Sequence, residues 1–130
     1  MHVLVTPRPP AKRAAIIEAQ TLFVPYLVST LRRQGLDVVR AAPRIRCRSL
    51  ARIAPDVLLV GVDELRAPLV TLRRLRRLLP GARIVLFTHS ADRAWAVLAR
   101  AVGANAVVGP TDDEGDLVSA CVPVCAVAGG

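Results

Sequence analysis

The residues best placed to do chemistry follow an apolar run in the middle of the chain. This run, "PDVLLVGVDEL" at 55–65, breaks at Gly61 and continues with two acids, Asp63 and Glu64. The stretch 56–61 is typical of a strand buried on both faces of a parallel sheet, and functional groups gather at the carboxyl ends of such strands. Asp63 is therefore a candidate metal or phosphate ligand. The alternative is that both acids are loop residues that cap the next segment.

A second polar cluster, "THSAD" at 88–92, combines hydroxyl groups, an imidazole and a carboxylate. A hydrolase site needs a nucleophile and a base brought together across the fold, and the chain has no "GxSxG" turn. We therefore expect a strand-to-helix loop in which Ser90 or Asp92 caps the following helix. The chain also has no "GxGxxG" or P-loop motif, so the sequence predicts neither an enzyme nor a cofactor.

The spacing of cysteines and histidines indicates no metal site. Cys121 and Cys125 are one helical turn apart, with Pro123 between them. The two histidines, His2 and His89, are far apart in the sequence. We expect buried thiols rather than a disulfide or a zinc site.

The composition is that of one globular domain with a basic surface. Of the 130 residues, 53% are hydrophobic and only 3% are aromatic, so the core must consist mainly of aliphatic side chains. The formal net charge is +8, but no nucleic-acid-binding motif is present, and we expect no direct contact with nucleic acid. No apolar run is long enough to span a membrane and no signal peptide is visible, so we expect a cytoplasmic protein.

From residue 14 onward, β-branched runs alternate with helical periodicity, which is typical of a parallel α/β sheet. The predicted strands are 14–18, 37–41, 56–61, 83–88 and 105–109. The predicted helices are 21–34, 47–54, 69–79, 92–102 (or from residue 90) and 112–122.

Apolar spacing also predicts the buried face of each longer helix. The inward residues should be Phe23, Leu27, Thr30 and Leu31 in the first helix, Leu72, Leu75 and Leu79 in the third, and Trp95, Leu98 and Val102 in the fourth. The stripe of Arg73, Arg76 and Arg77 should face solvent.

Residues 1–13 are predicted to be an N-terminal extension to the domain, which spans 14–130. The run "HVLVT" at 2–6 could add an edge strand. A single helix over 14–34 is disfavoured because Pro25 would lie in its middle, where a proline costs about 3 kcal/mol. In a helix that begins near Thr21, Pro25 falls in or just after the first turn.

Four segments together resemble the receiver domain of bacterial two-component response regulators, in particular those with LuxR-type output domains. They are "IIEAQTLF" (16–23), "PDVLLVG" (55–61), "PGARIVLFT" (80–88) and "GANAVVGPTDDEGDL" (103–117). The resemblance covers about residues 14–128 and preserves the order and spacing of the segments. It implies a flavodoxin-like, doubly wound sheet of five parallel strands in the order 2-1-3-4-5, in three αβα layers.

The resemblance further implies phosphoryl transfer from a histidine kinase to an aspartate, with Mg²⁺ on an acidic pair, a hydroxyl and a lysine. Glu18 keeps the first acid of the pair, whereas Ala19 stands at the second. Gly61 stands at the acceptor position and Pro110 at the lysine position, while Thr88 keeps the hydroxyl. Glycine cannot accept a phosphoryl group, so the pattern predicts a degenerate, phosphorylation-independent receiver. In the alternative, Asp63 takes over part of this chemistry.

Receivers of this kind work through contacts between proteins, and the face made by the fourth helix, the fifth strand and the fifth helix is their usual contact face. Val107 stands at the family's aromatic switch position, and Trp95 and Arg100 belong to the expected switch and contact region, although Trp95 fits a core residue better. We expect a homodimer, a protein partner or a linked DNA-binding output domain. Alternatively, Ala19, Gly61 and Pro110 leave a neutral, more apolar pocket that takes a small organic ligand.

Overall fold

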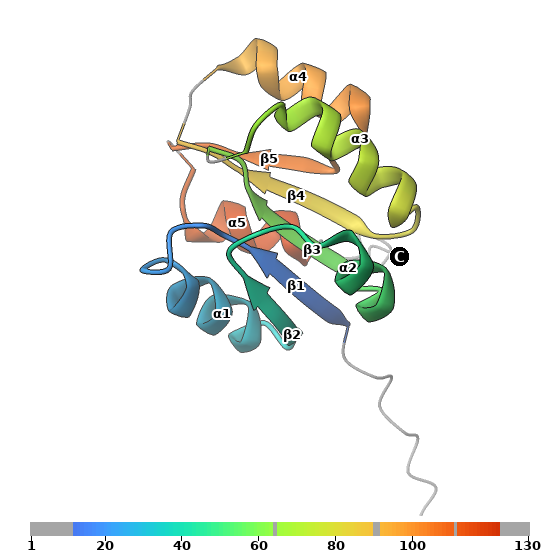
Figure 1. The fold of residues 1–130 in the computed structure, drawn as a ribbon. Coiled ribbons are helices and arrows are strands. Elements are labelled where there is room, and N and C mark those ends of the chain that lie inside the picture. Colours follow the sequence, from blue (N-terminus) through green and yellow to red (C-terminus); the bar gives the residue numbers. More distant parts are fainter. Residues whose placement is uncertain (1–11, 64, 90–91, 111, 123–130) are drawn as a thin grey trace, which may run out of the picture.

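The computed structural model describes residues 12–63, 65–89, 92–110 and 112–122 (Figure 1). The strands are β1 (Arg13–Ile17), β2 (Asp37–Ala42), β3 (Val57–Gly61), β4 (Arg83–Phe87) and β5 (Ala106–Val108). The helices are α1 (Val24–Arg33), α2 (Cys47–Ile53), α3 (Pro68–Leu78), α4 (Arg93–Val102) and α5 (Glu114–Cys121). Each predicted element is present, with its ends shifted by a few residues at most.

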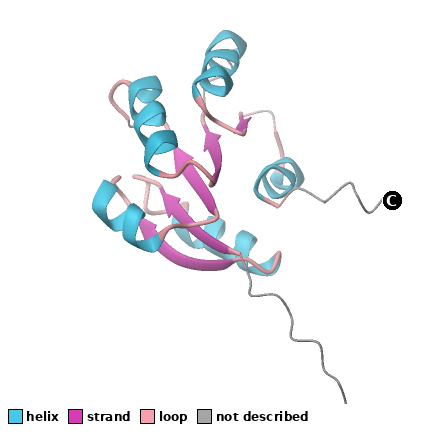
Figure 2. Ribbon diagram, turned by 90° about the vertical axis from the view of Figure 1, so that its right-hand side faces the viewer, coloured by secondary structure: helices cyan, strands magenta, loops and turns pink. Residues whose placement is uncertain are grey.

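The strands form one parallel sheet in the order β2-β1-β3-β4-β5, as predicted. Helices cover both faces of this sheet and complete three αβα layers (Figure 2). Strand β3 lies at the centre, and Leu58, Leu59 and Val60 are all 0% exposed. The strand order reverses between β1 and β3, so the connections leave these two strands in opposite directions and open a crevice at their carboxyl ends.

The sheet separates two hydrophobic clusters. One cluster packs α2, α3 and α4 on the sheet through Leu50, Leu72, Leu75 and Ala99. The other packs α1 and α5 on the opposite face through Leu27, Leu31, Leu117 and Cys121. The burial predicted for Thr30 and for Leu79 is confirmed as well.

Two predicted helix faces are wrong in part. Leu98 of α4 is 52% exposed, whereas Ala99 is fully buried and Trp95 and Val102 pack against the core. Positions 95, 99 and 102 form the i, i+4, i+7 stripe of a short helix, and position 98 falls at the edge of this stripe. Phe23 is 41% exposed because α1 begins at Val24, which leaves Phe23 outside the helix.

Arg76 is a third residue placed differently from the prediction, because it does not lie on a solvated arginine face. Its guanidinium donates to the backbone oxygens of Gly103 (2.7 Å from Nη2) and Ala82 (2.6 Å) and to Asn105 Oδ1 (2.6 Å). Gly103 has φ 143°, and a Cβ on it would lie 2.9 Å from the Cβ of Arg76. The glycine therefore permits the close approach through which Arg76 joins α3 to the turn between α4 and β5.

Several smaller predictions concern the ends of elements. Asp92 caps α4 by accepting from the amides of Ala94 (2.9 Å) and Trp95 (3.2 Å). Pro25 lies in the first turn of α1, as expected. Strand β1 begins at Arg13, the last residue of the predicted N-terminal extension, and the edge strand at 2–6, Ser90 and Cys125 lie outside the described residues. In the described part of the chain, no helix is long and apolar enough to cross a membrane.

Candidate functional site

The residues predicted for the site gather at the carboxyl edge of the sheet. Glu18 follows β1, Gly61 ends β3, Asp63 follows β3 and Thr88 follows β4. Because the strands are parallel, their carboxyl ends share one edge and bring these positions together. The structure brings Glu18 onto Gly61 and joins Asp63 to Thr88, so two local pairs replace a single shared centre.

The first pair explains the glycine in the central strand. Glu18 is only 6% exposed, and its Oε1 accepts from the amide of Gln20 (2.8 Å). A Cβ built on Gly61 would overlap Oε2 of Glu18 and would lie 2.9 Å from Cζ of Phe87. The carboxylate from β1 thus fills the space into which a side chain at position 61 would have to extend.

The second pair ties two loops together. The Thr88 hydroxyl donates to Asp63 Oδ1 (2.8 Å), and the His89 amide donates to Asp63 Oδ2 (3.0 Å). The His89 imidazole lies near the same carboxylate, with Nε2 4.0 Å from Oδ2. Asp63 therefore links the loop after β3 to the loop after β4. It does not cap the next helix, α3, which was the alternative predicted for it from the sequence.

The two carboxylates do not form a multidentate metal site within the described ranges. No group of three or more His, Cys, Asp or Glu side chains that could hold a metal ion occurs among these residues. A divalent cation such as Mg²⁺ needs several oxygen ligands, and Glu18 and Asp63 each already accept backbone amide hydrogens. The carboxylates act here as local structural acceptors.

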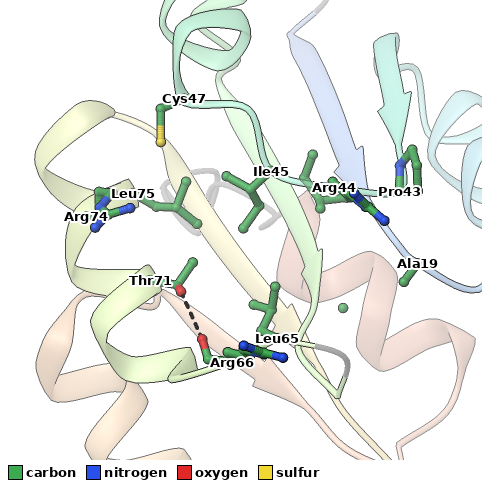
Figure 3. Close-up of a pocket in the computed structure, with 12 residues that line it drawn as sticks. Ala19, Pro43, Arg44, Ile45, Cys47, Leu65, Arg66, Thr71, Arg74 and Leu75 are labelled. Atoms are coloured by element: carbon green, nitrogen blue, oxygen red, sulfur yellow. Dashed lines mark hydrogen bonds between the residues drawn. The ribbon is translucent and has the colours of Figure 1, made fainter.

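Two cavities flank this edge, and they divide residues that the sequence placed in one neutral pocket. Ala19 and Gly61 line a cavity of about 900 Å³, whereas Pro110 lines a separate one of about 280 Å³ with Phe23 and Tyr26. The larger cavity is also not neutral, because Arg44, Arg66 and Arg74 line it (Figure 3). Sequence reasoning missed these arginines, which come from two loops and a helix and share no motif.

The predicted contact face divides into buried and exposed parts. Trp95 and Val107 are half-buried and pack against the cluster beneath α4, which confirms the core placement of the tryptophan. Arg100 is exposed. Next to it in the helix, Val97 is 66% and Leu98 52% exposed, so α4 presents apolar side chains to solvent.

Comparison with known proteins shows which solved structures share this fold. No protein-family model matches the chain, and no curated protein is similar to it in sequence. Among solved structures, it is similar to a LuxR-family two-component response regulator from Aurantimonas sp. SI85-9A1, with 25% identity, a TM-score of 0.68, and coverage of 84% of this chain and 81% of that one. It is also similar to the signal receiver domain of a NarL response regulator from Mycobacterium tuberculosis, with 19% identity, a TM-score of 0.74, and coverage of 86% and 94%.

A third similar structure shows the chemistry associated with this fold elsewhere. It is a Burkholderia pseudomallei response regulator with a phosphorylated aspartic acid and a calcium ion, with 22% identity, a TM-score of 0.69, and coverage of 91% of this chain and 69% of that one. The strand order and the two helical layers of this chain match its similarity to these three structures. The chain thus has the fold of the receiver domains of response regulators, including those of the LuxR and NarL type.

Proposed function

We propose that this chain is a phosphorylation-independent, receiver-like domain that acts through protein–protein contact, chiefly self-association, in signal transduction. The LuxR and NarL regulators among its structural neighbours suggest a transcriptional context, with a DNA-binding output domain as a linked or separate partner. Phosphoryl transfer to the chain has no part in this proposal.

The observation that carries the proposal is the Glu18 carboxylate on Gly61. By the receiver resemblance, position 61 corresponds to the acceptor aspartate, but the chain has no side chain there and Glu18 fills the adjacent space. Two further positions agree, because Ala19 supplies no second metal ligand and Pro110 supplies no cation for a phosphoryl oxygen. The remaining hydroxyl, on Thr88, donates to Asp63.

The exposed apolar residues of α4 support contact with another protein. Val97 and Leu98 lie next to each other on the solvent side of this helix, at 66% and 52% exposure. Burying such side chains against a second apolar surface yields about 25 cal/mol per Å² of area removed from water. We propose this face of α4 as the self-association surface.

Phosphorylation is tested by incubating the protein with acetyl phosphate or beryllofluoride in the presence of Mg²⁺. We expect no adduct by intact mass spectrometry and no shift in the melting temperature. An acid-labile adduct that maps to Asp63, and that is lost in Asp63→Asn, would refute phosphorylation independence.

Self-association is tested by light scattering over a concentration series. We expect a dimer whose dissociation is promoted by Val97→Glu and by Leu98→Glu. The matched control is Val70→Glu, because Val70 is also an apolar helix residue, 62% exposed, but lies on α3. A strictly monomeric protein at all concentrations, or equal effects of the three variants, would exclude the α4 surface.

A further inference from the structure

The large cavity lies where α2, α3 and the loops after β1, β2 and β3 meet. Its volume of about 900 Å³ is within the range of sites that bury an organic molecule, about 300–1,000 Å³. Its inner wall is apolar, with Ile17, Ile45, Leu65 and Leu75 among the lining residues. The cavity can therefore cover the apolar part of a ligand.

The polar part of the cavity wall is cationic. Figure 3 shows Arg74 on α3, across the cavity from Arg44 on the segment between β2 and α2, with Arg66 from the loop before α3 at a third side. No carboxylate occurs among the described lining residues. Glu18 lies beside Gly61 at the edge of the cavity, but it is 6% exposed and accepts from the Gln20 amide.

The side chains of these three arginines have no partner within the described residues, so their charges are available to a ligand. Arg33 pairs with Glu114 at 2.8 Å, and Arg76 donates to backbone oxygens and to Asn105. In contrast, the guanidinium groups of Arg44, Arg66 and Arg74 make no hydrogen bond or ion pair inside the described part of the chain. Three cations that line one cavity and have no partners in the described chain favour an anion, because arginine binds carboxylate and phosphate groups in a bidentate manner.

We propose that this cavity binds an organic anion with an apolar body, held by Arg44, Arg66 and Arg74 over the apolar wall. The ligand is of the class of aromatic or aliphatic carboxylates, sulfonates and phosphate esters. The site goes beyond the proposed function, because none of the residues that line it belongs to α4. Either assignment can therefore fail while the other stands.

The first test compares two fluorescent probes that differ in charge. 8-Anilinonaphthalene-1-sulfonate carries a sulfonate on its aromatic body, and N-phenyl-1-naphthylamine has the same ring system without the sulfonate. We expect saturable, one-to-one binding of the sulfonate probe, about tenfold tighter than that of the neutral probe, because a charge-assisted hydrogen bond contributes about that factor. Absence of binding, or equal affinities for both probes, would overturn the proposal.

The second test uses two triple variants with the same change in net charge. Arg44→Gln/Arg66→Gln/Arg74→Gln removes the cations of the cavity. Its matched control, Arg48→Gln/Arg73→Gln/Arg77→Gln, removes three exposed arginines outside the cavity. The first variant should bind the sulfonate probe about tenfold or more weaker than the unmodified protein, whereas the control should bind it at most about twofold weaker. The circular dichroism spectra of both variants should be unchanged. An equal loss of affinity in both variants would mean that the probe is attracted only by the basic surface of the protein, and it would refute the proposed site.

A third readout locates the bound probe. Cys47 is half-buried, lines the cavity and is a free thiol. N-ethylmaleimide labelling of the Cys47 peptide, followed by mass spectrometry, should slow about tenfold when the sulfonate probe is present at ten times its Kd, because only about a tenth of the sites then remain empty. If labelling of Cys47 proceeds at the same rate with and without the probe, the probe binds elsewhere and the assignment is wrong.

Discussion

Adding one methyl group at Gly61 should destabilise the domain, because the Glu18 carboxylate fills the space beside its Cα. A Cβ there would overlap Glu18 Oε2 and would lie 2.9 Å from Phe87 Cζ. Inserting a methyl group into a packed site costs about 1–3 kcal/mol, and the reduced freedom of alanine in the unfolded chain offsets about 0.4–1 kcal/mol. We therefore expect Gly61→Ala to lower the free energy of unfolding by about 1–2 kcal/mol.

A double-mutant cycle identifies the cause of this cost. Glu18→Ala removes the obstructing carboxylate, so Gly61→Ala should cost about 1 kcal/mol less in that background, which is a coupling energy typical of residues in contact. The contact with Phe87 remains and should leave a small residual cost. Urea denaturation followed by far-UV circular dichroism measures all four proteins, with unchanged m-values as the check on two-state unfolding.

The matched control is Gly81→Ala, because a Cβ at Gly81 would have nothing within 4 Å. It should be neutral or slightly stabilising. If Gly61→Ala is as harmless as the control, or costs the same with and without Glu18, then the carboxylate does not fill that space and the main support for the proposed function is lost. Gly61→Asp should destabilise the protein more than its uncharged counterpart Gly61→Asn, because it adds a second carboxylate next to Glu18.

Two further predictions concern residues that hold the scaffold. Arg76→Ala should lower the free energy of unfolding by about 2–3 kcal/mol, because it leaves backbone oxygens around Gly103 without their charged donor, while Arg77→Ala on the exposed face should change it by less than about 0.5 kcal/mol. Similar values for both in urea titrations would contradict the structural role of Arg76. Burial raises the pKa of the Cys121 thiol from 9.0 to about 12, an effect that Arg83 partly opposes. Above pH 9.0 the unfolded chain releases this proton while the folded chain keeps it, so stability should fall with rising pH, by about 1.3 kcal/mol between roughly pH 8 and pH 10. In Cys121→Ala, the free energy of unfolding should fall less over this pH range, by the same amount. An equal fall in the variant and in the unmodified protein would rule out the thiol as its cause.

Much of the fold could be predicted from the sequence because its signals are local. The apolar run of β3, the leucine spacing of α3 and the aspartate that caps α4 each depend on a few neighbouring residues and on the period of one element. The errors arose where this period was ambiguous. Leu98 and Ala99 are both acceptable inward residues for α4, and only the distance to the sheet decides that the smaller side chain is buried.

For the candidate site, too, local features could be predicted from the sequence and contacts between distant segments could not. The sequence by itself determined which groups stand at the carboxyl edge of the sheet, including the glycine in "PDVLLVGVDEL", Ala19 and Pro110. Only the tertiary structure decided what fills that edge: the Glu18 carboxylate on Gly61, the Thr88 hydroxyl on Asp63, and three arginines around one cavity. The reason is physical, because these contacts join segments far apart in the chain, and their distances depend on how the strands stack rather than on the spacing of residues along any one of them.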